Sequence, residues 1–262
     1  MPQRKRMGRV HSLWLYPVKG MGGICVNEKP LYIDQNMGVA GDRQFAIGRK
    51  ADMDVSDWRP KGQFHVGMNT PGVSRAVGVD DEYLGADQAL TREFVEQQLL
   101  PRLNLDPNQY TLVDSEGQFR LTDSNEPYVS FLNLATVKEL SKWCGQEIDP
   151  QRFRMNVWVE DMPSGAELNY IQGHKLPHYY PMQVGNLRLG IDKLAQRCKA
   201  IDQSPATGQY DLELHQRILP EFLKSKSYAG SPKKGSHSIM GWYALPASAG
   251  TLYQDNPVWF GE

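Results

Sequence analysis

Residues 189–214 read LGIDKLAQRCKAIDQSPATGQYDLEL, and Cys198 stands near the middle of this stretch between Arg197 and Lys199. Two cationic neighbours stabilise a thiolate, the form of cysteine that binds soft metals and attacks electrophiles. The apolar residues of 194–201 predict a strand, and the Ser-Pro and Thr-Gly pairs within 202–208 predict a turn. We therefore expect the thiol near a strand end and beside a loop.

The local residues leave two interpretations of Cys198 open. It is either a reactive or metal-binding thiol, or a small apolar residue of a strand with solvated charged neighbours, which is the more common situation. Cys25 lies in an apolar strand-like run and Cys144 closes an amphipathic helix, both ordinary packing positions. Three widely spaced cysteines predict neither a disulfide framework nor a zinc site, so we expect reduced thiols.

The charge balance argues against several classes of partner. The chain has 29 basic and 30 acidic residues in 262, so it lacks the concentrated positive field that nucleic-acid binding requires. Its one basic run, Arg4-Lys5-Arg6, stands at the terminus, where disorder is expected. No apolar stretch reaches the length of a membrane span or a signal peptide. We expect a cytoplasmic protein without a nucleic-acid partner.

The first part of the chain predicts a β-rich domain over residues 1–115. Short apolar runs separated by glycine and proline indicate strands of a barrel or curled sheet. These runs are residues 10–18, 24–33, 44–47 and 76–79, with turn signals that include Pro71-Gly72. A helix is expected from Asp87 to Leu99, and residues 110–113 return to strand.

The remaining residues, 116–262, predict a second, mixed domain. Asn133 is typical of the N-cap of a helix, and Gly145 is typical of the residue that ends the same helix. The other expected elements are strands at 153–159, 182–189 and 243–245, a short helix within 211–223 interrupted at Pro220, and a surface loop over 225–238.

Basic residues recur where the chain is expected to turn. Lys19 follows a strand, Arg43 begins one, and Arg152 and Arg154 share one face of another. Arginine and lysine at loop mouths bind phosphate or carboxylate, so these residues would form an anion site if the fold brings them together. The pair His174 and His178 is flanked by Gly173 and Pro177, which disfavours the helix a metal pair would need. The sequence has no Gly-x-Gly-x-x-Gly, Walker or Gly-x-Ser-x-Gly motif, which are the usual motifs of nucleotide-binding proteins and serine hydrolases. These two functions are therefore less expected.

Taken together, these motifs resemble the MOSC family, named after the C-terminal domain of molybdenum cofactor sulfurases. The matching residues are Tyr16-Pro17-Val18-Lys19, Asp42-Arg43, Arg154-Met155-Asn156, Arg197-Cys198, the turn of residues 202–208, and Gly241-Trp242-Tyr243 near the end. Their order and rough spacing agree with the family over nearly the whole chain.

The resemblance implies a β-rich α+β protein in which an N-terminal β-barrel-like domain precedes a mixed MOSC β-barrel with a few helices. It also implies a molybdenum–molybdopterin cofactor and an oxidoreductase that reduces N-hydroxylated or related small substrates, with Cys198 as catalytic residue and metal ligand. A separate electron-donor protein, of flavin or iron–sulfur type, would supply the electrons. The cofactor contacts carried over are Lys19, Gly20, Arg43, Asn133, Thr136, Arg154, Asn156, Arg197 and Tyr243.

The sequence also departs from the family pattern. Gly20 stands where many relatives have serine, and Asn133-Leu134-Ala135-Thr136 replaces a Ser-x-x-Ser motif. One alternative to an enzyme is therefore a carrier that holds sulfur as a Cys198 persulfide, or delivers cofactor to a partner, without turnover of its own. A degenerate structural barrel is another. Pyridoxal phosphate accompanies relatives with a fused pyridoxal-dependent domain, so it is the less expected cofactor here.

Overall fold

The computed structural model describes most of the chain: residues 4–50, 92–117, 120–122, 124, 126–173, 179–226 and 238–261. The predicted strand at 76–79, the Pro71-Gly72 turn, the first part of the Asp87 helix, the His174 and His178 pair and residues 227–237 of the expected surface loop lie outside these residues.

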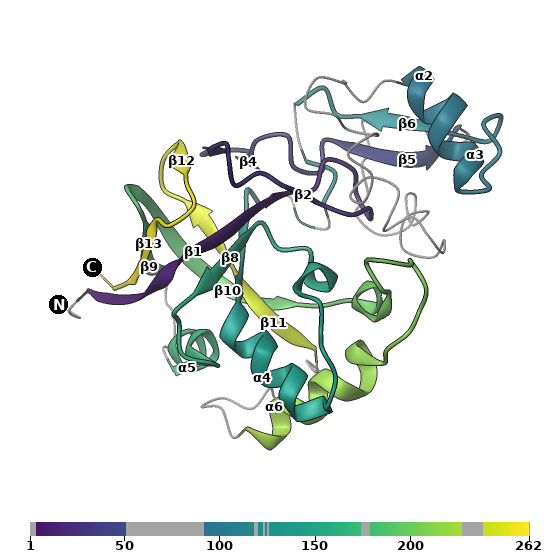
Figure 1. Cartoon of the computed structure of the whole chain (residues 1–262). Coiled ribbons are helices and arrows are strands. Elements are labelled where there is room, and N and C mark those ends of the chain that lie inside the picture. The colour runs from purple at the N-terminus through teal and green to yellow at the C-terminus, as the bar shows by residue number, and fades with distance from the viewer. Residues whose placement is uncertain are drawn as a thin grey trace.

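A closed seven-stranded barrel forms the body of the protein (Figure 1). Its strands are β1 (Lys5–Leu15), β7 (Val129–Asn133), β8 (Val157–Glu160), β9 (Tyr180–Val184), β10 (Leu187–Gln196), β11 (Ile239–Pro246) and β13 (Pro257–Phe260). They are hydrogen-bonded in the order β13-β9-β10-β11-β7-β8-β1, and β1 pairs again with β13. Because β7 and β8 run parallel and the other neighbours antiparallel, the barrel is mixed. The predicted β-rich fold class is confirmed.

Apolar side chains from all sides of the barrel close its interior. Val10 and Leu13 of β1 are fully buried with Phe131, Trp242 and Phe260. The rings of Phe131 and Trp242 stack with centroids 5.3 Å apart, and Phe260 meets Trp242 edge-on at 5.9 Å. Aromatic pairs in these geometries add to the free energy gained by burial alone, so they hold the barrel closed.

The N-terminal strand completes a barrel made mostly of C-terminal strands. Lys5 and Arg6 of β1 pair with Phe260 and Trp259, so the prediction of a disordered basic end is wrong. Strand pairing also crosses the predicted boundary at residue 115, because β1 belongs to the large barrel.

The other N-terminal strands form small sheets. β3 (Leu31–Asp34) and β4 (Gly38–Val39) join β12 (Gly250–Leu252), and β5 (Phe45–Arg49) pairs with β6 (Tyr110–Asp114). The β5–β6 sheet lies in a lobe outside the barrel (Figure 1) with α2 (Arg92–Phe94), the π-turn Val95–Leu99 and α3 (Leu100–Arg102). The predicted strands at 44–47 and 110–113 are thereby confirmed.

Helix α4 (Leu134–Cys144) forms as predicted. The Asn133 side chain accepts from the Ala135 amide, and Gly145 ends the helix in the left-handed conformation. Helix α5 (Ala166–Gly173) and α6 (Leu219–Ser225) lie beside it below the barrel (Figure 1). The helix expected within 211–223 forms as a π-helical turn, Leu214–Ile218, followed directly by α6. Pro220 lies in the first turn of α6, where a missing amide hydrogen costs no helical hydrogen bond, so it marks a change of helix type and not a gap.

Several predicted strand limits are corrected. Residues 24–33 form two strands, β2 (Ile24–Cys25) and β3, while residues 182–189 span the β9–β10 hairpin. Cys25 is exposed, so its predicted packing position is wrong. The strand expected over 194–201 ends at Gln196, because the chain turns there into a 3₁₀ turn, Lys199–Asp202.

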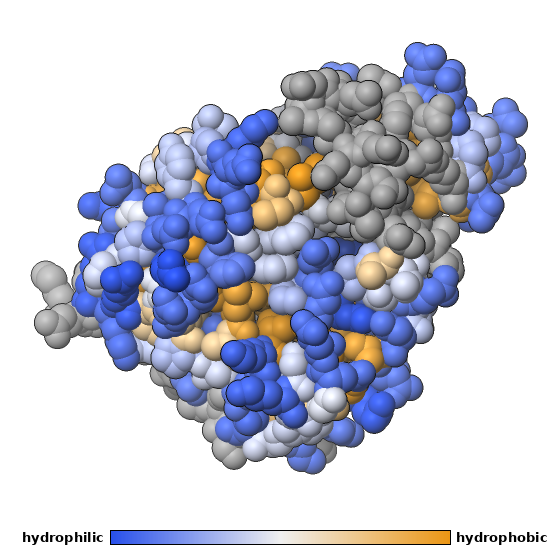
Figure 2. Space-filling view, in the orientation of Figure 1, coloured by the Kyte–Doolittle hydropathy of each residue, from blue (hydrophilic) through white to orange (hydrophobic). Residues whose placement is uncertain are grey.

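The face of the molecule in Figure 2 is mostly hydrophilic, with smaller hydrophobic patches between the polar side chains. Within the described part of the chain, no helix has the length and apolar character needed to cross a membrane.

Two glycines with positive φ test how tightly the barrel is packed. Gly241 has φ +77°, and an added Cβ would lie 2.2 Å from the carbonyl oxygen of Phe131; Gly145 has φ +73° and open space around it. We expect Gly145→Ala to lower the free energy of unfolding by about 1 kcal/mol through backbone strain alone. Gly241→Ala should lower it by about 3 kcal/mol because overpacking adds to the strain. Urea unfolding measures both, and equal losses would contradict this account of the barrel.

Candidate functional site

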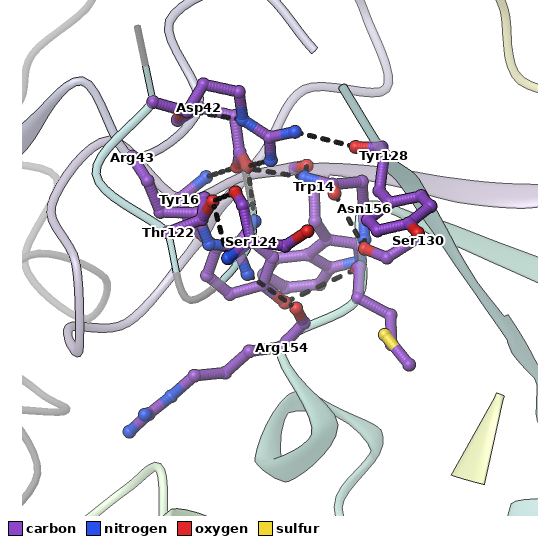
Figure 3. Close-up of polar contacts among 12 residues, drawn as sticks. Trp14, Tyr16, Asp42, Arg43, Thr122, Ser124, Tyr128, Ser130, Arg154 and Asn156 are labelled. Atoms are coloured by element: carbon purple, nitrogen blue, oxygen red, sulfur yellow. Dashed lines mark hydrogen bonds and ion pairs between the residues drawn. The ribbon is translucent and has the colours of Figure 1, made fainter. Parts of the chain in front are cut away.

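A buried carboxylate, Asp42, joins the predicted motifs (Figure 3). Its Oδ1 accepts from the Tyr16 amide at 3.0 Å and from Asn156 Nδ2 at 2.9 Å. Its Oδ2 accepts from the guanidinium groups of Arg43 and Arg120. The side chain has no solvent exposure, so every acceptor direction is used inside the protein.

Opposite charges decide the ionisation of this carboxyl group. Burial alone would raise the pKa of Asp42, but the charges of Arg43 and Arg120 and the Asn156 hydrogen bond outweigh it and lower the pKa. Asp42 is therefore a carboxylate that fixes two arginines.

Arg43 and Asn156, both predicted to contact a cofactor, are engaged by the protein. Arg43 has a left-handed backbone with φ +50°, lies 4.9 Å from the Tyr16 ring centroid, and donates from Nη2 to the Arg154 carbonyl at 3.0 Å. Asn156 is fully buried, and its Oδ1 accepts from the Ser130 hydroxyl at 2.7 Å. Both side chains hold the strand ends and turns around the site in place.

Arg154 presents its guanidinium differently. It follows the 3₁₀ turn Pro150–Phe153 and has φ +47°, so the predicted strand does not begin until Val157 and the expected shared strand face of Arg152 and Arg154 is wrong. Among the described residues the Arg154 guanidinium has no hydrogen-bond or ion-pair partner, and Figure 3 shows it extending away from the Asp42 cluster. Burial lowers the pKa of Arg154.

Cys198 lies where the chain leaves the barrel. It is the N-cap of the 3₁₀ turn Lys199–Asp202, two residues after the end of β10, and it is exposed. Its two cationic neighbours in sequence point elsewhere. Arg197 donates to the Phe153 carbonyl and, at 3.4 Å, to the Tyr243 hydroxyl. The Lys199 ammonium lies 5.1 Å from the Tyr210 ring centroid.

A pocket lies between residues of the N-terminal segment, the turn before β8 and the turn after β10. Its lining residues are Gly22, Gly23, Gln151, Arg152, Arg154, Ala200, Gln203 and Pro205. Arg154 is the predicted contact residue that lines it. Lys19 and Gly20 do not, although they precede the Gly22-Gly23 wall; the Lys19 amide donates to Phe45 at 2.7 Å, and Gly20 has φ +82°.

Asn133 and Thr136 lie in another polar cluster. Asn133 Nδ2 donates to Glu167 Oε2 at 2.7 Å, and the Thr136 hydroxyl donates to Glu167 Oε1 at 2.8 Å. All three side chains are buried and join α4 to α5. Burial raises the pKa of Glu167.

Sequence reasoning missed several residues that build the site. The sequence marks Asp42 only as part of the Asp42-Arg43 motif, although a carboxylate directly before an arginine, amid other basic motifs, is a signal for a buried ion-pair cluster. Arg120 offered no local signal, because it lies 78 residues from its partner Asp42. Among the described residues no group of three histidine, cysteine, aspartate or glutamate side chains is placed to hold a metal ion.

Replacing Asp42 tests the buried ion-pair cluster. Asp42→Asn leaves Arg43 and Arg120 without their carboxylate, and we expect the free energy of unfolding to fall by about 3–5 kcal/mol at neutral pH. The control Asp161→Asn removes a carboxylate that is 65% exposed in its ion pair with Arg9 and should cost about 1 kcal/mol or less. Because the pKa of Asp42 is lowered, its contribution is present above the ordinary carboxyl range and is lost as the pH falls through the lowered value. Urea unfolding at several pH values checks both statements, and similar losses for the two variants would refute the ion-pair cluster.

Glu167 has the opposite pH dependence. Because its pKa is raised in the folded protein, its stabilising contribution is present below the ordinary glutamate pKa and is lost as the pH rises through the raised value. Glu167→Gln stays neutral. The free energy of unfolding of wild type minus that of the variant should therefore fall as the pH rises from acid to neutral. A flat difference in urea unfolding would show that the carboxyl titrates normally.

Comparisons with known proteins place the chain in a family. The MOSC domain family model matches residues 118–259, more than half of the chain. The crystal structure of the YuaD protein from Bacillus subtilis is similar over 99% of this chain and 98% of that chain, with 12% sequence identity and a TM-score of 0.44. No curated protein matches the sequence. The family match, which covers the strands and turns that carry Arg154 and Cys198, shows that the chain belongs to the MOSC domain family.

Proposed function

We propose that this MOSC protein binds a molybdenum–molybdopterin cofactor at Arg154 and Cys198 and reduces N–O bonds of small substrates. One observation carries the proposal: the Arg154 guanidinium lines a pocket together with Ala200, two residues after Cys198, and it has no hydrogen-bond or ion-pair acceptor among the described residues. A partly buried cation that its own protein leaves without an acceptor is suited to an anionic ligand.

The residues fit the chemistry of this cofactor. Its phosphate and the carbonyl edge of its pterin are acceptors for a guanidinium fork. Its dithiolene sulfurs would hold the metal, so the protein would need to add one soft thiolate, and the exposed Cys198 stands two residues before Ala200, which lines the pocket. Arg197 and Tyr243, hydrogen-bonded to each other at 3.4 Å, would support the metal side of the site.

The bound cofactor would supply two-electron redox chemistry, and the chain would supply position and charge. Reduction of an amidoxime consumes two electrons and two protons and releases the oxygen as water. The electrons would come from a separate flavin or iron–sulfur protein. In this proposal Arg154 binds the anionic cofactor, Cys198 ligates the metal, and Arg43 and Asn156 act by fixing the turns. Lys19 and Gly20, close in sequence to the Gly22-Gly23 wall, remain proposed cofactor contacts.

Cofactor content tests the proposal. Protein from a molybdenum-replete host should contain molybdenum and pterin. Arg154→Gln should lose both because the anion loses its cation. Cys198→Ser should retain pterin better than Arg154→Gln but lose reduction of an amidoxime by reduced viologen. The control Lys138→Gln, at an exposed position of α4, should match wild type.

Two outcomes would overturn the proposal. Wild type without molybdenum or pterin contradicts cofactor binding. A one-sulfur adduct on Cys198 by mass spectrometry, with cofactor absent and no amidoxime reduction, would instead support the sulfur-carrier function, which an exposed thiol also permits.

A further inference from the structure

Two 3₁₀ turns meet beside the pocket, and one arginine connects them. The arginine turn consists of Pro150–Phe153 followed by Arg154, and the cysteine turn consists of Cys198 followed by Lys199–Asp202. The two turns are in contact. Arg152 extends from the first turn toward the second, and its side chain is only 6% exposed.

Arg152 grips the far side of the cysteine turn with a guanidinium fork. Its Nη1 and Nη2 donate to the two carboxylate oxygens of Asp211 at 2.8 and 2.7 Å, and Nη1 also approaches the Ile201 carbonyl at 3.4 Å. The Asp211 amide in turn donates to the Asp202 carbonyl at 3.2 Å. The fork thus holds both the body of the cysteine turn and the loop that leaves it.

The geometry of the fork requires arginine. A lysine ammonium is a single point charge and cannot make two parallel hydrogen bonds to one carboxylate. Arg152 and Arg154 are separated by one residue, so a bond that fixes Arg152 against Asp211 also fixes where the Arg154 backbone stands relative to the cysteine turn. The carbonyl of Arg154 is held from the other side by Arg43.

We propose that Arg152, through its fork to Asp211, is a positioning residue that keeps the Arg154 guanidinium at the pocket wall that it shares with Ala200 of the cysteine turn. This inference rests on the proposed site but concerns the protein without its cofactor. If this is so, the Arg154 charge creates a positive potential at Cys198. The size of that potential then depends on Arg152, even though Asp211 neutralises the charge of Arg152 itself.

The potential at a thiol is measurable with two disulfide reagents of different charge. Dithiobis(nitrobenzoate) is anionic and dithiodipyridine is uncharged at neutral pH. The ratio of their rate constants cancels the thiolate fraction and reports the charge that the reagent meets. The measurement uses cofactor-free protein carrying Cys25→Ser and Cys144→Ser, so that Cys198 is the remaining thiol of three. A further Cys198→Ser change provides the blank.

Charge-preserving variants separate positioning from simple electrostatics. Arg154→Gln should lower the anionic-to-neutral rate ratio about fivefold, which corresponds to about 1 kcal/mol, the interaction of two unit charges at about 4 Å in water. Arg152→Lys keeps the charge but loses the fork, and should lower the ratio nearly as far. Asp211→Asn removes a negative charge, which by electrostatics alone would raise the ratio; the positioning role predicts a decrease. Lys138→Gln should leave the ratio unchanged.

The outcomes are decisive in either direction. A lower ratio in both Arg152→Lys and Asp211→Asn, with thermal unfolding that remains cooperative, supports the positioning role. If Asp211→Asn does not fold, Arg152→Lys decides. A wild-type ratio in Arg152→Lys, a higher ratio in Asp211→Asn, or no effect of Arg154→Gln overturns the inference. Because the assay needs no molybdenum, its result is independent of whether the proposed cofactor binds.

Discussion

The buried ionised carboxylate of Asp42 is the constraint on which the site depends. It lies between the N-terminal turn that carries Tyr16 and the segment that carries Asn156, which belong to distant parts of the chain. An isolated carboxylate would be costly to bury, and two arginines make it favourable. The same pairing that neutralises the carboxylate orients Arg43 toward the Arg154 carbonyl. The ion pairs that make the buried carboxylate stable therefore also fix the position of the Arg154 backbone.

This arrangement divides the arginines between structure and function. Arg43 and Arg120 are committed to Asp42, Arg152 to the Asp211 carboxylate, and Arg197 to carbonyl and hydroxyl oxygens near the barrel end. In the described part of the chain, Arg154 differs because its guanidinium faces a pocket without an acceptor. The hydrogen bonds of each arginine therefore distinguish Arg154, the candidate ligand-binding residue, from the other arginines of the site. Their positions in the sequence do not.

The sequence predicts features that depend on local chemistry. Asn133 and Gly145 mark both ends of α4, because capping involves residues within one turn. Short apolar runs separated by glycine and proline predict strands, because these signals are local as well. The sequence does not predict that β1 closes a barrel with β13, since that register is set by contacts across almost the whole chain. The left-handed backbone of Arg154 is not predictable from the sequence either, because tertiary hydrogen bonds stabilise it. The sequence neighbours of Cys198 suggest a positive charge at the thiol, but the Arg197 and Lys199 side chains contact other residues.

The central claim is that one protein thiolate completes the coordination of a metal whose cofactor is held by an arginine. X-ray absorption at the molybdenum edge tests it most directly, because the technique counts sulfur ligands at the metal. The account predicts one fewer sulfur neighbour in Cys198→Ser than in wild type, with the cofactor's own sulfurs retained. The same sulfur count in both proteins would show that Cys198 does not ligate the metal, and would contradict the account.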